Sequence, residues 1–487
     1  MSHIPSRFIV VVSPLLLLAS SSSVLTAPPA AAKEEGTVTP VAEKVLNADA
    51  DSAAADAAVT PAIQPAAPVE VLKTPAIVAE PEPLAPAAEA PKLSTLAAQV
   101  QASRSLADST PAPAAADVPG MMAPFGEISN FSLGHTVPGS KWRLYPHAGI
   151  SGIFDDNIYL TENNKTSDFY FALSPGLGAT YGSDDARLQV KADYTASFLA
   201  FMDHSSEDAV DQNALMRVTY TLPKLTLGLN LGFQSLSGAN IDVGDRVRRQ
   251  IYYAGITSSY ALDEKFSVDL DVDETVADYK GLLDSNETRI QTWLNYQATG
   301  KLNVGVGITG GFLNVQESPD QTYEELLLRA RYDATGKLSI YGNAGVQVQQ
   351  SDVTDVAPVF AIGVAYSPLA KTTITVDIHE RIYGSAALEG QDYRATGIMV
   401  GLNQELWVNV SAFLNAGYEN TAYYAVEKGI AADREDHYVY VRVGPDWQVR
   451  PWWRLSSFYE FSNNSSSGIG NRPFTRNRVG IQANFEF

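Results

Sequence analysis

The last thirteen residues, from Thr475 to Phe487, constrain the fold more than any other stretch of this chain. They read TRNRVGIQANFEF, a strict alternation of apolar and polar side chains. Because successive side chains of a strand point to opposite faces, the apolar residues share one face. A soluble protein usually ends in frayed, polar residues, whereas a membrane barrel must close its last strand against its first. The ending therefore predicts a transmembrane β-barrel, with an ordinary edge strand as the alternative.

The same ending resembles the C-terminal signal by which outer-membrane barrels are recognised for assembly. The apolar positions that carry this resemblance are Val479, Ile481, Phe485 and Phe487. It implies the barrel-assembly machinery as a partner and the bacterial outer membrane as the location.

Composition narrows the class of protein further. The chain has 487 residues, 45% of them hydrophobic, yet no stretch approaches the roughly eighteen consecutive apolar residues of a membrane-spanning helix. The apolar content must therefore lie in alternating strands. The absence of cysteine is typical of an exported bacterial protein and excludes a thiolate metal site. A net charge of −21 argues against nucleic acid as a partner, because a protein that binds phosphate backbones needs a basic face.

The N-terminal third has a different character. Residues 1–32 are typical of a signal peptide, with a short apolar core and cleavage expected after Ala27 or, preferably, Ala32. Residues 33–140 are rich in alanine and proline, which predicts a disordered periplasmic segment that buries too little apolar area to fold. One window, Pro91 to Leu106, could form a short helix. Residues 141–487 form the predicted outer-membrane barrel, which contacts lipid and lipopolysaccharide.

The predicted barrel shows repeated blocks of alternation, such as Leu225 to Phe233 and Leu188 to Phe198. Very short turns, one of them predicted over Asn403 to Leu406, alternate with longer polar loops, which is typical of outer-membrane barrels. The blocks predict an all-β, antiparallel barrel of about 18 strands, with about 16 as the fallback. An even number places both ends at the periplasmic side. Because proline cannot donate to a strand ladder, Pro175 predicts a bulge or kink.

Residues 150–205 resemble a family of bacterial outer-membrane proteins catalogued as putative β-barrel porin type two. The matching features are the Asp155-Asp156-Asn157 turn, the Ser-Asp-Phe sequence that begins at Ser167, and Ser174-Pro175-Gly176. The resemblance implies a barrel fold. Some members accompany exopolysaccharide secretion, which implies periplasmic export components as possible partners.

Three charged rows are expected to face the barrel lumen, because their neighbours on each strand are apolar. Opposed acidic and basic rows could tune ion selectivity, and the alternative is that the charges pair to stiffen the wall. The candidate residues are Asp269, Asp271 and Asp273 in the first row, Arg329 and Arg331 in the second, and Asp377, His379 and Arg381 in the third.

Nothing else in the sequence predicts an enzyme. Asp377 and His379 resemble half of the dyad of the omptin outer-membrane proteases, but a lumen histidine in a charge network is the simpler interpretation. No metal-ligand spacing, nucleophile motif or phosphate-binding glycine loop is present. We therefore expect no catalysis, no cofactor and no metal.

The predicted function is porin-like, passive passage of hydrophilic solutes through a polar lumen. One alternative is an outer-membrane export channel for an exopolysaccharide, which would use inward aromatic platforms. The candidates for such platforms are Trp293, Tyr341, Phe413 and Phe458. A second alternative is a structural or adhesion barrel whose lumen is closed by loops.

Overall fold

A computed structural model describes residues 134–183 and 185–487. The predicted signal peptide, and residues 33–133 of the predicted disordered segment with the helix window at 91–106, lie outside the described residues. The described chain is all-β apart from one short 3-10 helix, η2 (Ser205–Glu207).

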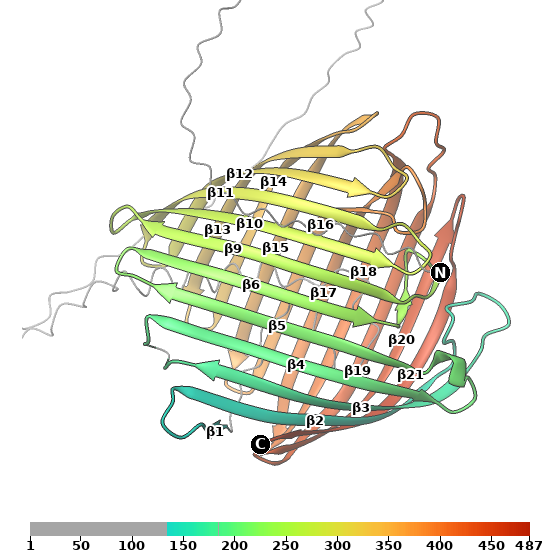
Figure 1. The fold of residues 1–487 in the computed structure, drawn as a ribbon, viewed down its shortest axis with the longest axis horizontal. Coiled ribbons are helices and arrows are strands. Elements are labelled where there is room, and N and C mark those ends of the chain that lie inside the picture. Colours follow the sequence, from blue (N-terminus) through green and yellow to red (C-terminus); the bar gives the residue numbers. More distant parts are fainter. Residues whose placement is uncertain (1–133, 184) are drawn as a thin grey trace, which may run out of the picture. The chain divides into compact units, whose positions relative to one another are not determined.

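Long antiparallel strands stand side by side around a closed wall, tilted as Figure 1 shows. In wall order they are β2 (Trp142–Asp155), β3 (Asp168–Tyr181), β4 (Leu188–Phe201), β5 (Ala209–Thr221), β6 (Leu225–Leu236), β9 (Arg249–Ala261), β10 (Phe266–Tyr279), β11 (Ser285–Thr299), β12 (Leu302–Val315), β13 (Gln321–Thr335), β14 (Leu338–Gln350), β15 (Thr354–Leu369), β16 (Thr372–Gly384), β17 (Gln391–Trp407), β18 (Val410–Ala425), β19 (Glu435–Arg450), β20 (Trp453–Ser467) and β21 (Phe474–Glu486). The prediction of 18 strands is confirmed, and the fallback of 16 is wrong.

The wall closes where the sequence predicts it. β21 pairs with β20 on one side and with β2 on the other, from His147↔Glu486 to Asp155↔Arg478. The two-residue strand β1 (His135–Thr136) pairs with the start of β2, and the N–H of Phe487 donates to the Pro146 carbonyl at 2.9 Å. The described start and the end of the chain therefore lie at the same rim of the barrel.

The two rims differ in their connections. One rim, the turn rim, carries short turns such as Val408–Asn409, where Asn409 adopts a φ of 67°. The opposite rim, the loop rim, carries longer connections, among them the β6–β9 loop with its small hairpin β7 (Ala239–Asn240) and β8 (Asp245–Arg246). The turn predicted over Asn403 to Leu406 is wrong, because β17 continues to Trp407. The chain turns instead at Asn409, since asparagine tolerates the left-handed conformation.

The outer face carries an apolar belt. Leu270, Ile308 and Leu328, for example, are 44%, 62% and 66% exposed, although each is a large apolar residue. Aromatic side chains are exposed along the turn rim, where they suit the membrane–water interface. These are Tyr220, Tyr260, Tyr332, Tyr366, Trp407, Trp447 and Trp452. An apolar belt on a closed sheet is what a bilayer requires, so the chain forms a transmembrane β-barrel. Among the described residues, no helix is long and apolar enough to cross a membrane.

Prolines within strands change the ladders less than the sequence suggests. The bulge predicted at Pro175 is wrong: β3 runs unbroken, and the β2–β3 register passes through Ala148↔Pro175 without a shift. Toward β4, the pairing stops at Leu173↔Phe198 and resumes in the same register at Gly176↔Thr195. Since proline lacks only its own donor, the ladder loses two residue pairs on one side and keeps its register.

The motif residues near the start of the barrel fix its closure. Arg476 Nε donates to Asp155 Oδ2 at 2.9 Å, and Asn477 N donates to Asp156 Oδ1 at 2.6 Å. Asn157 Nδ2 donates to the Thr475 carbonyl at 3.0 Å. These bonds join the β2–β3 loop to β21, so the Asp155-Asp156-Asn157 turn has a structural role at the seam of the barrel.

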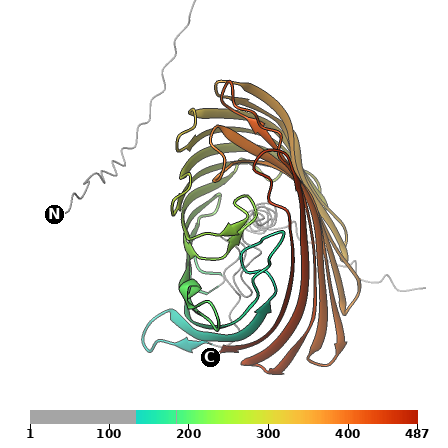
Figure 2. The same cartoon turned by 90° about the vertical axis from the view of Figure 1, so that its right-hand side faces the viewer.

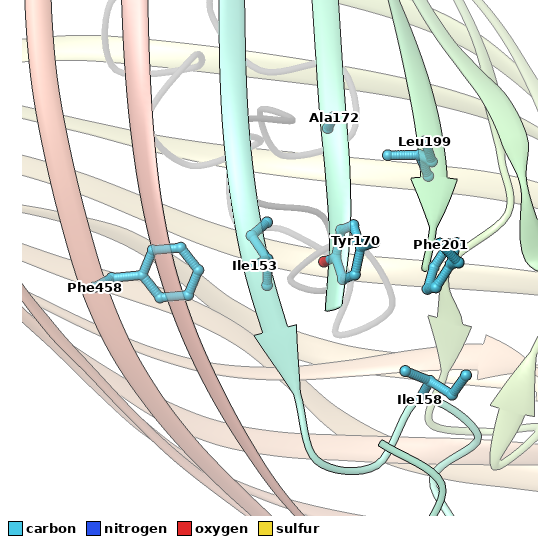
Figure 3. Close-up of a cluster of buried hydrophobic side chains, with 7 residues drawn as sticks. All are labelled: Ile153, Ile158, Tyr170, Ala172, Leu199, Phe201 and Phe458. Carbon is cyan, nitrogen blue, oxygen red and sulfur yellow. The ribbon is translucent and has the colours of Figure 1, made fainter. Parts of the chain in front are cut away.

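An apolar cluster supports the same region from inside the wall. Figure 3 shows side chains of β2, β3, β4 and β20 that come together there. Tyr170 stacks on Phe201 with ring centroids 4.8 Å apart. The members are Ile153, Ile158, Tyr170, Ala172, Leu199, Phe201 and Phe458. The inner face is therefore not uniformly polar, and this apolar patch anchors the loop that follows β2.

Candidate functional site: the inner wall and the mouth

The acidic row of β10 lies on the inner face of the wall. Asp269 is fully buried and Asp271 and Asp273 are nearly so, while Leu270 between them faces outward. This placement follows from strand alternation, because Leu270 pairs with Thr292 on the outer face and Asp269 with Trp293 on the inner face. The row expected from the sequence is thus assembled on one strand.

Asp269 belongs to a network that spans four strands. Asn295 Nδ2 donates to Asp269 Oδ2 at 2.8 Å, and Arg329 forms an ion pair with the same carboxylate. The Arg329 guanidinium also lies 4.4 Å from the centroid of the Trp293 ring. Between these strands, β12 presents Gly307, where a Cβ would meet the Trp293 ring at 2.5 Å. The glycine lets the indole lie flat against the wall beneath the arginine.

Asp273 and Arg331 of these two rows are paired on the same wall. Arg289 Nη2 donates to Asp273 Oδ2 at 3.2 Å, and the Tyr253 hydroxyl donates to Asp273 Oδ1 at 2.6 Å. Arg331 pairs with Asp333 at 3.3 Å. The arginines of β13 therefore lie beside the acidic row, and Arg329 pairs with it, as in the alternative in which the charges pair to stiffen the wall. Only two strands, β11 and β12, separate β10 from β13, so a long arginine side chain reaches the carboxylate directly.

The third row lies at β16, and its histidine bridges two carboxylates. His379 Nδ1 lies 3.1 Å from Asp377 Oδ1, and Nε2 lies 3.3 Å from Glu419 Oε2 on β18. The bridge passes over Gly397 of β17, where a Cβ would meet the His379 ring at 2.8 Å. Both ring nitrogens therefore contact carboxylates, which favours a charge network over activation of water. Arg381 follows on the same strand and is half-buried.

A fourth set of charges escaped the sequence analysis. Arg478 Nε donates to Glu460 Oε1 at 3.0 Å, and Arg442 lies 3.6 Å from the same carboxylate. Together with Arg476 they line the inner face of β19 to β21. In a ring of 18 strands, β10 is seventh and β19 is sixteenth, so this arginine-rich wall faces the acidic row across the lumen. The alternation at Arg476 and Arg478 was the signal in the sequence that could have identified it.

The aromatic platforms are covered to different extents. Trp293 lies beneath Arg329, and Phe458 lies beneath Arg442, whose guanidinium is 4.0 Å from the ring centroid. Tyr341 and Phe413 are half-buried. Two of the four aromatic faces proposed for sugar binding are thus occupied by guanidinium groups.

At the loop rim, Asp242 of the β6–β9 loop bridges the mouth of the barrel. Its carboxylate accepts hydrogen bonds from Ser385 Oγ at 3.0 Å, from Ala386 N at 2.8 Å and from the Tyr423 hydroxyl at 2.8 Å. Arg434 Nη1 donates to the Asp242 carbonyl at 2.7 Å. We call these residues the mouth clasp.

The mouth clasp spans the ring. β6 and β9 are the fifth and sixth strands of the wall, and β17 and β18 are the fourteenth and fifteenth, directly opposite. In Figure 2, which looks onto the loop rim, the β7–β8 hairpin and the β2–β3 loop lie inside the outline of the barrel. Burial by itself lowers the pKa of Arg434, but hydrogen bonding to Asp436 raises it overall, so the clasp keeps its cation.

Other residues considered from the sequence have structural partners. Three arginines near the start of β9 could in principle meet lipopolysaccharide phosphates, but Arg246 pairs with Glu207 at 3.1 Å and Arg249 is buried. Arg248 alone of the three is exposed. Within residues 134–183 and 185–487, no group of three or more histidine or acidic side chains is arranged to hold a metal ion.

No protein-family model matches the chain, and no curated protein matches it. Among solved structures, Pseudomonas aeruginosa OpdK with vanillate is similar at 12% identity and a TM-score of 0.40, over 71% of this chain and 99% of that one. Pseudomonas aeruginosa OccK2 (OpdF) in complex with glucuronate is 9% identical, with a TM-score of 0.42, over 71% of this chain and 98% of that one. Acinetobacter baumannii OccAB3 is 9% identical, with a TM-score of 0.41, over 71% of this chain and 99% of that one. These likenesses are of barrel architecture at low identity.

Proposed function

We propose that this chain is an outer-membrane channel through which small hydrophilic solutes pass passively. The observation that carries the proposal is the division between the two faces of the closed wall: apolar residues form the outer belt, and the inner face carries charged and amide side chains. A barrel with this division presents a polar path through an apolar bilayer. The acidic row and the facing arginine-rich wall would orient charged or dipolar solutes in transit.

The location and partners follow from the same features. The belt contacts outer-membrane lipid, and exposed Arg248 is placed at the loop rim, where lipopolysaccharide phosphates would lie. Val479 and Ile481 face outward on β21, and Phe485 and Phe487 stack on Trp452. We propose that this ending is recognised by the barrel-assembly machinery.

Membership of the porin type two family, and with it exopolysaccharide export with periplasmic components, remains a narrower proposal. Its support is the motif in residues 150–205, whose acidic turn fixes the seam of the barrel. The covered faces of Trp293 and Phe458 favour small solutes over a sugar polymer. A structural barrel closed by its loops is the second alternative, which the mouth clasp supports.

The test is conductance of the refolded full chain in a planar bilayer. We expect a steady conductance that prefers cations, and a weaker preference in Asp271→Asn, because one inward carboxylate is removed. Asp263→Asn makes the same charge change at an exposed turn and should leave the preference unchanged. A barrel that is folded but passes no current would overturn the channel proposal in favour of the loop-closed barrel.

A further inference from the structure

The barrel wall is split at the loop rim between β15 and β16. Their ladder begins only at Phe360↔Glu380, although β15 pairs with β14 from Thr354 onward and β16 pairs with β17 as far as Gly384. Residues 354–359 therefore have a strand neighbour on one side only, and so do residues 381–384. Pro358 lies on this unpaired edge. The backbone N–H that proline lacks would have no strand partner on that side, so the strand loses no hydrogen bond there.

The segment that leaves the wall lies against the inner face of the strands it passes. We call residues 381–396 and 420–430, from β16, β17, β18 and their loops, the flap. Ile382 packs against Trp293, Leu327 and Val359. A Cβ on Gly384 would lie 2.7 Å from Val315 Cγ2, so the end of β16 reaches the inner face of β12.

Polar contacts hold the flap in this position. Arg394 Nη2 donates to Asp355 Oδ2 at 2.8 Å, and Gln321 Nε2 donates to Asp392 Oδ1 at 3.1 Å. The Tyr424 hydroxyl donates to Gln349 Oε1 at 2.7 Å. On its other face, the flap supplies the Ser385 and Tyr423 groups of the mouth clasp, so its position determines whether the mouth is bridged.

The three strands are tied together at the base of the flap. The His379 bridge to Asp377 and Glu419 crosses β17 at Gly397, and Thr396 Oγ1 donates to Glu380 Oε2 at 3.2 Å. The outward rows also change character here. They are apolar up to Ile378 and Ile398. Beyond these residues, β16 carries Glu380 and Ile382, and β17 carries Thr396, Arg394 and Asp392. The flap therefore lies beyond the apolar belt, where water or lipid headgroups can accept its charged face.

We propose that the flap is a gate with two positions: folded inward, as here, and returned to the wall beside the free edge of β15. The inference rests on the proposed channel function. In the second position the existing ladder continues in register, so that Val356 pairs with Gly384 and Pro358 with Ile382. Asp242 then loses its partners on the flap, and the mouth opens. A ligand or ion that contacts the flap in only one of its two positions would increase the population of that position.

The cysteine-free chain allows a direct test with one shared substitution, Gly384→Cys. Combined with Val315→Cys, it should form a disulfide only when the flap is folded inward. Combined with Val356→Cys, it should form one only when the flap is in the wall. β12 and β15 are three strand spacings apart, about 14 Å, and a disulfide needs Cα atoms within about 7 Å. Because both pairs contain Gly384→Cys, strain at that position is matched.

Both pairs are refolded as the full chain in lipid, oxidised, and assayed for cross-linking and for conductance. We expect both to cross-link. The Val315 pair should then hold a low conductance without openings, the Val356 pair a high conductance without closures, and reduction should restore transitions in both.

If the Val356 pair stays reduced while the Val315 pair cross-links, the flap does not move and the gate is ruled out. If both cross-link with equal conductance, the flap moves but gates nothing, which also overturns the proposal. If every variant cross-links as expected and none conducts, the channel function fails while the motion stands.

Discussion

At the scale of single residues, the inner wall depends on charges that are buried and paired. Arg329→Gln leaves the fully buried Asp269 without its guanidinium partner. We expect the free energy of unfolding to fall by about 3 kcal/mol, because a buried charge loses its compensation. Heat- and denaturant-induced unfolding in detergent measures it. Asp269→Asn together with Arg329→Gln should recover part of the loss, and additive losses would show that the two side chains do not interact.

Asp242 has a different role, since its partners lie on the far side of the mouth. Asp242→Ala leaves Ser385, Tyr423 and the Ala386 amide without an acceptor. We expect faster proteolysis at residues 385–390 and a larger open conductance, with a cost of about 2 kcal/mol from unsatisfied buried groups. Asp245→Ala, in the same loop but exposed, is the matched control. Equal proteolysis of the two variants would show that Asp242 does not hold the mouth.

At the scale of elements, β12 offers a comparison between its two faces. Gly307→Ala places a Cβ 2.5 Å from the Trp293 ring, whereas Gly310→Ala faces outward with no atom within 4 Å. The first should destabilise the barrel by about 1–3 kcal/mol through overpacking, and the second should be neutral or slightly stabilising. Tryptophan fluorescence during unfolding measures both. Equal stability would show that the indole can leave the wall without cost.

The sequence predicted the strands well wherever local alternation of apolar and polar residues decides the structure. Strand number, closure by β21 and the inward acidic row all follow from period-two patterns. It failed at Asn403 to Leu406, where polar residues resemble a turn but face the lumen or the interface. It left open whether the arginines of β13 face the acidic row or pair with it, because strand alternation gives the face of a side chain and not its distance to charges on other strands. The flap was not predictable, because alternation continues unbroken through Ile382 while the strand leaves the wall through contacts with distant strands.

At the scale of the whole molecule, the C-terminal aromatic residue belongs both to the proposed assembly signal and to the packing of the turn rim. Phe487 stacks on Trp452 with ring centroids 6.1 Å apart. If the residue is an assembly signal, Phe487→Ala should reduce the amount of folded barrel in cells while refolding in vitro stays near normal. Trp452→Ala removes the same stack without touching the terminus. Equal defects in the two variants, in cells and in vitro, would instead assign Phe487 a purely structural role.

The seam between β2 and β21 also governs the order of folding. Every wall ladder except the seam joins two strands that are close in sequence, so these ladders can form early as hairpins. The seam joins partners such as Asp155 and Arg476, which are 321 residues apart. Closing so long a loop has a large entropic cost, and contacts of this kind form late. The nascent barrel is therefore an open, curved sheet whose edges β2 and β21 stay free until they pair with each other, and this interval is when it most needs protection from aggregation.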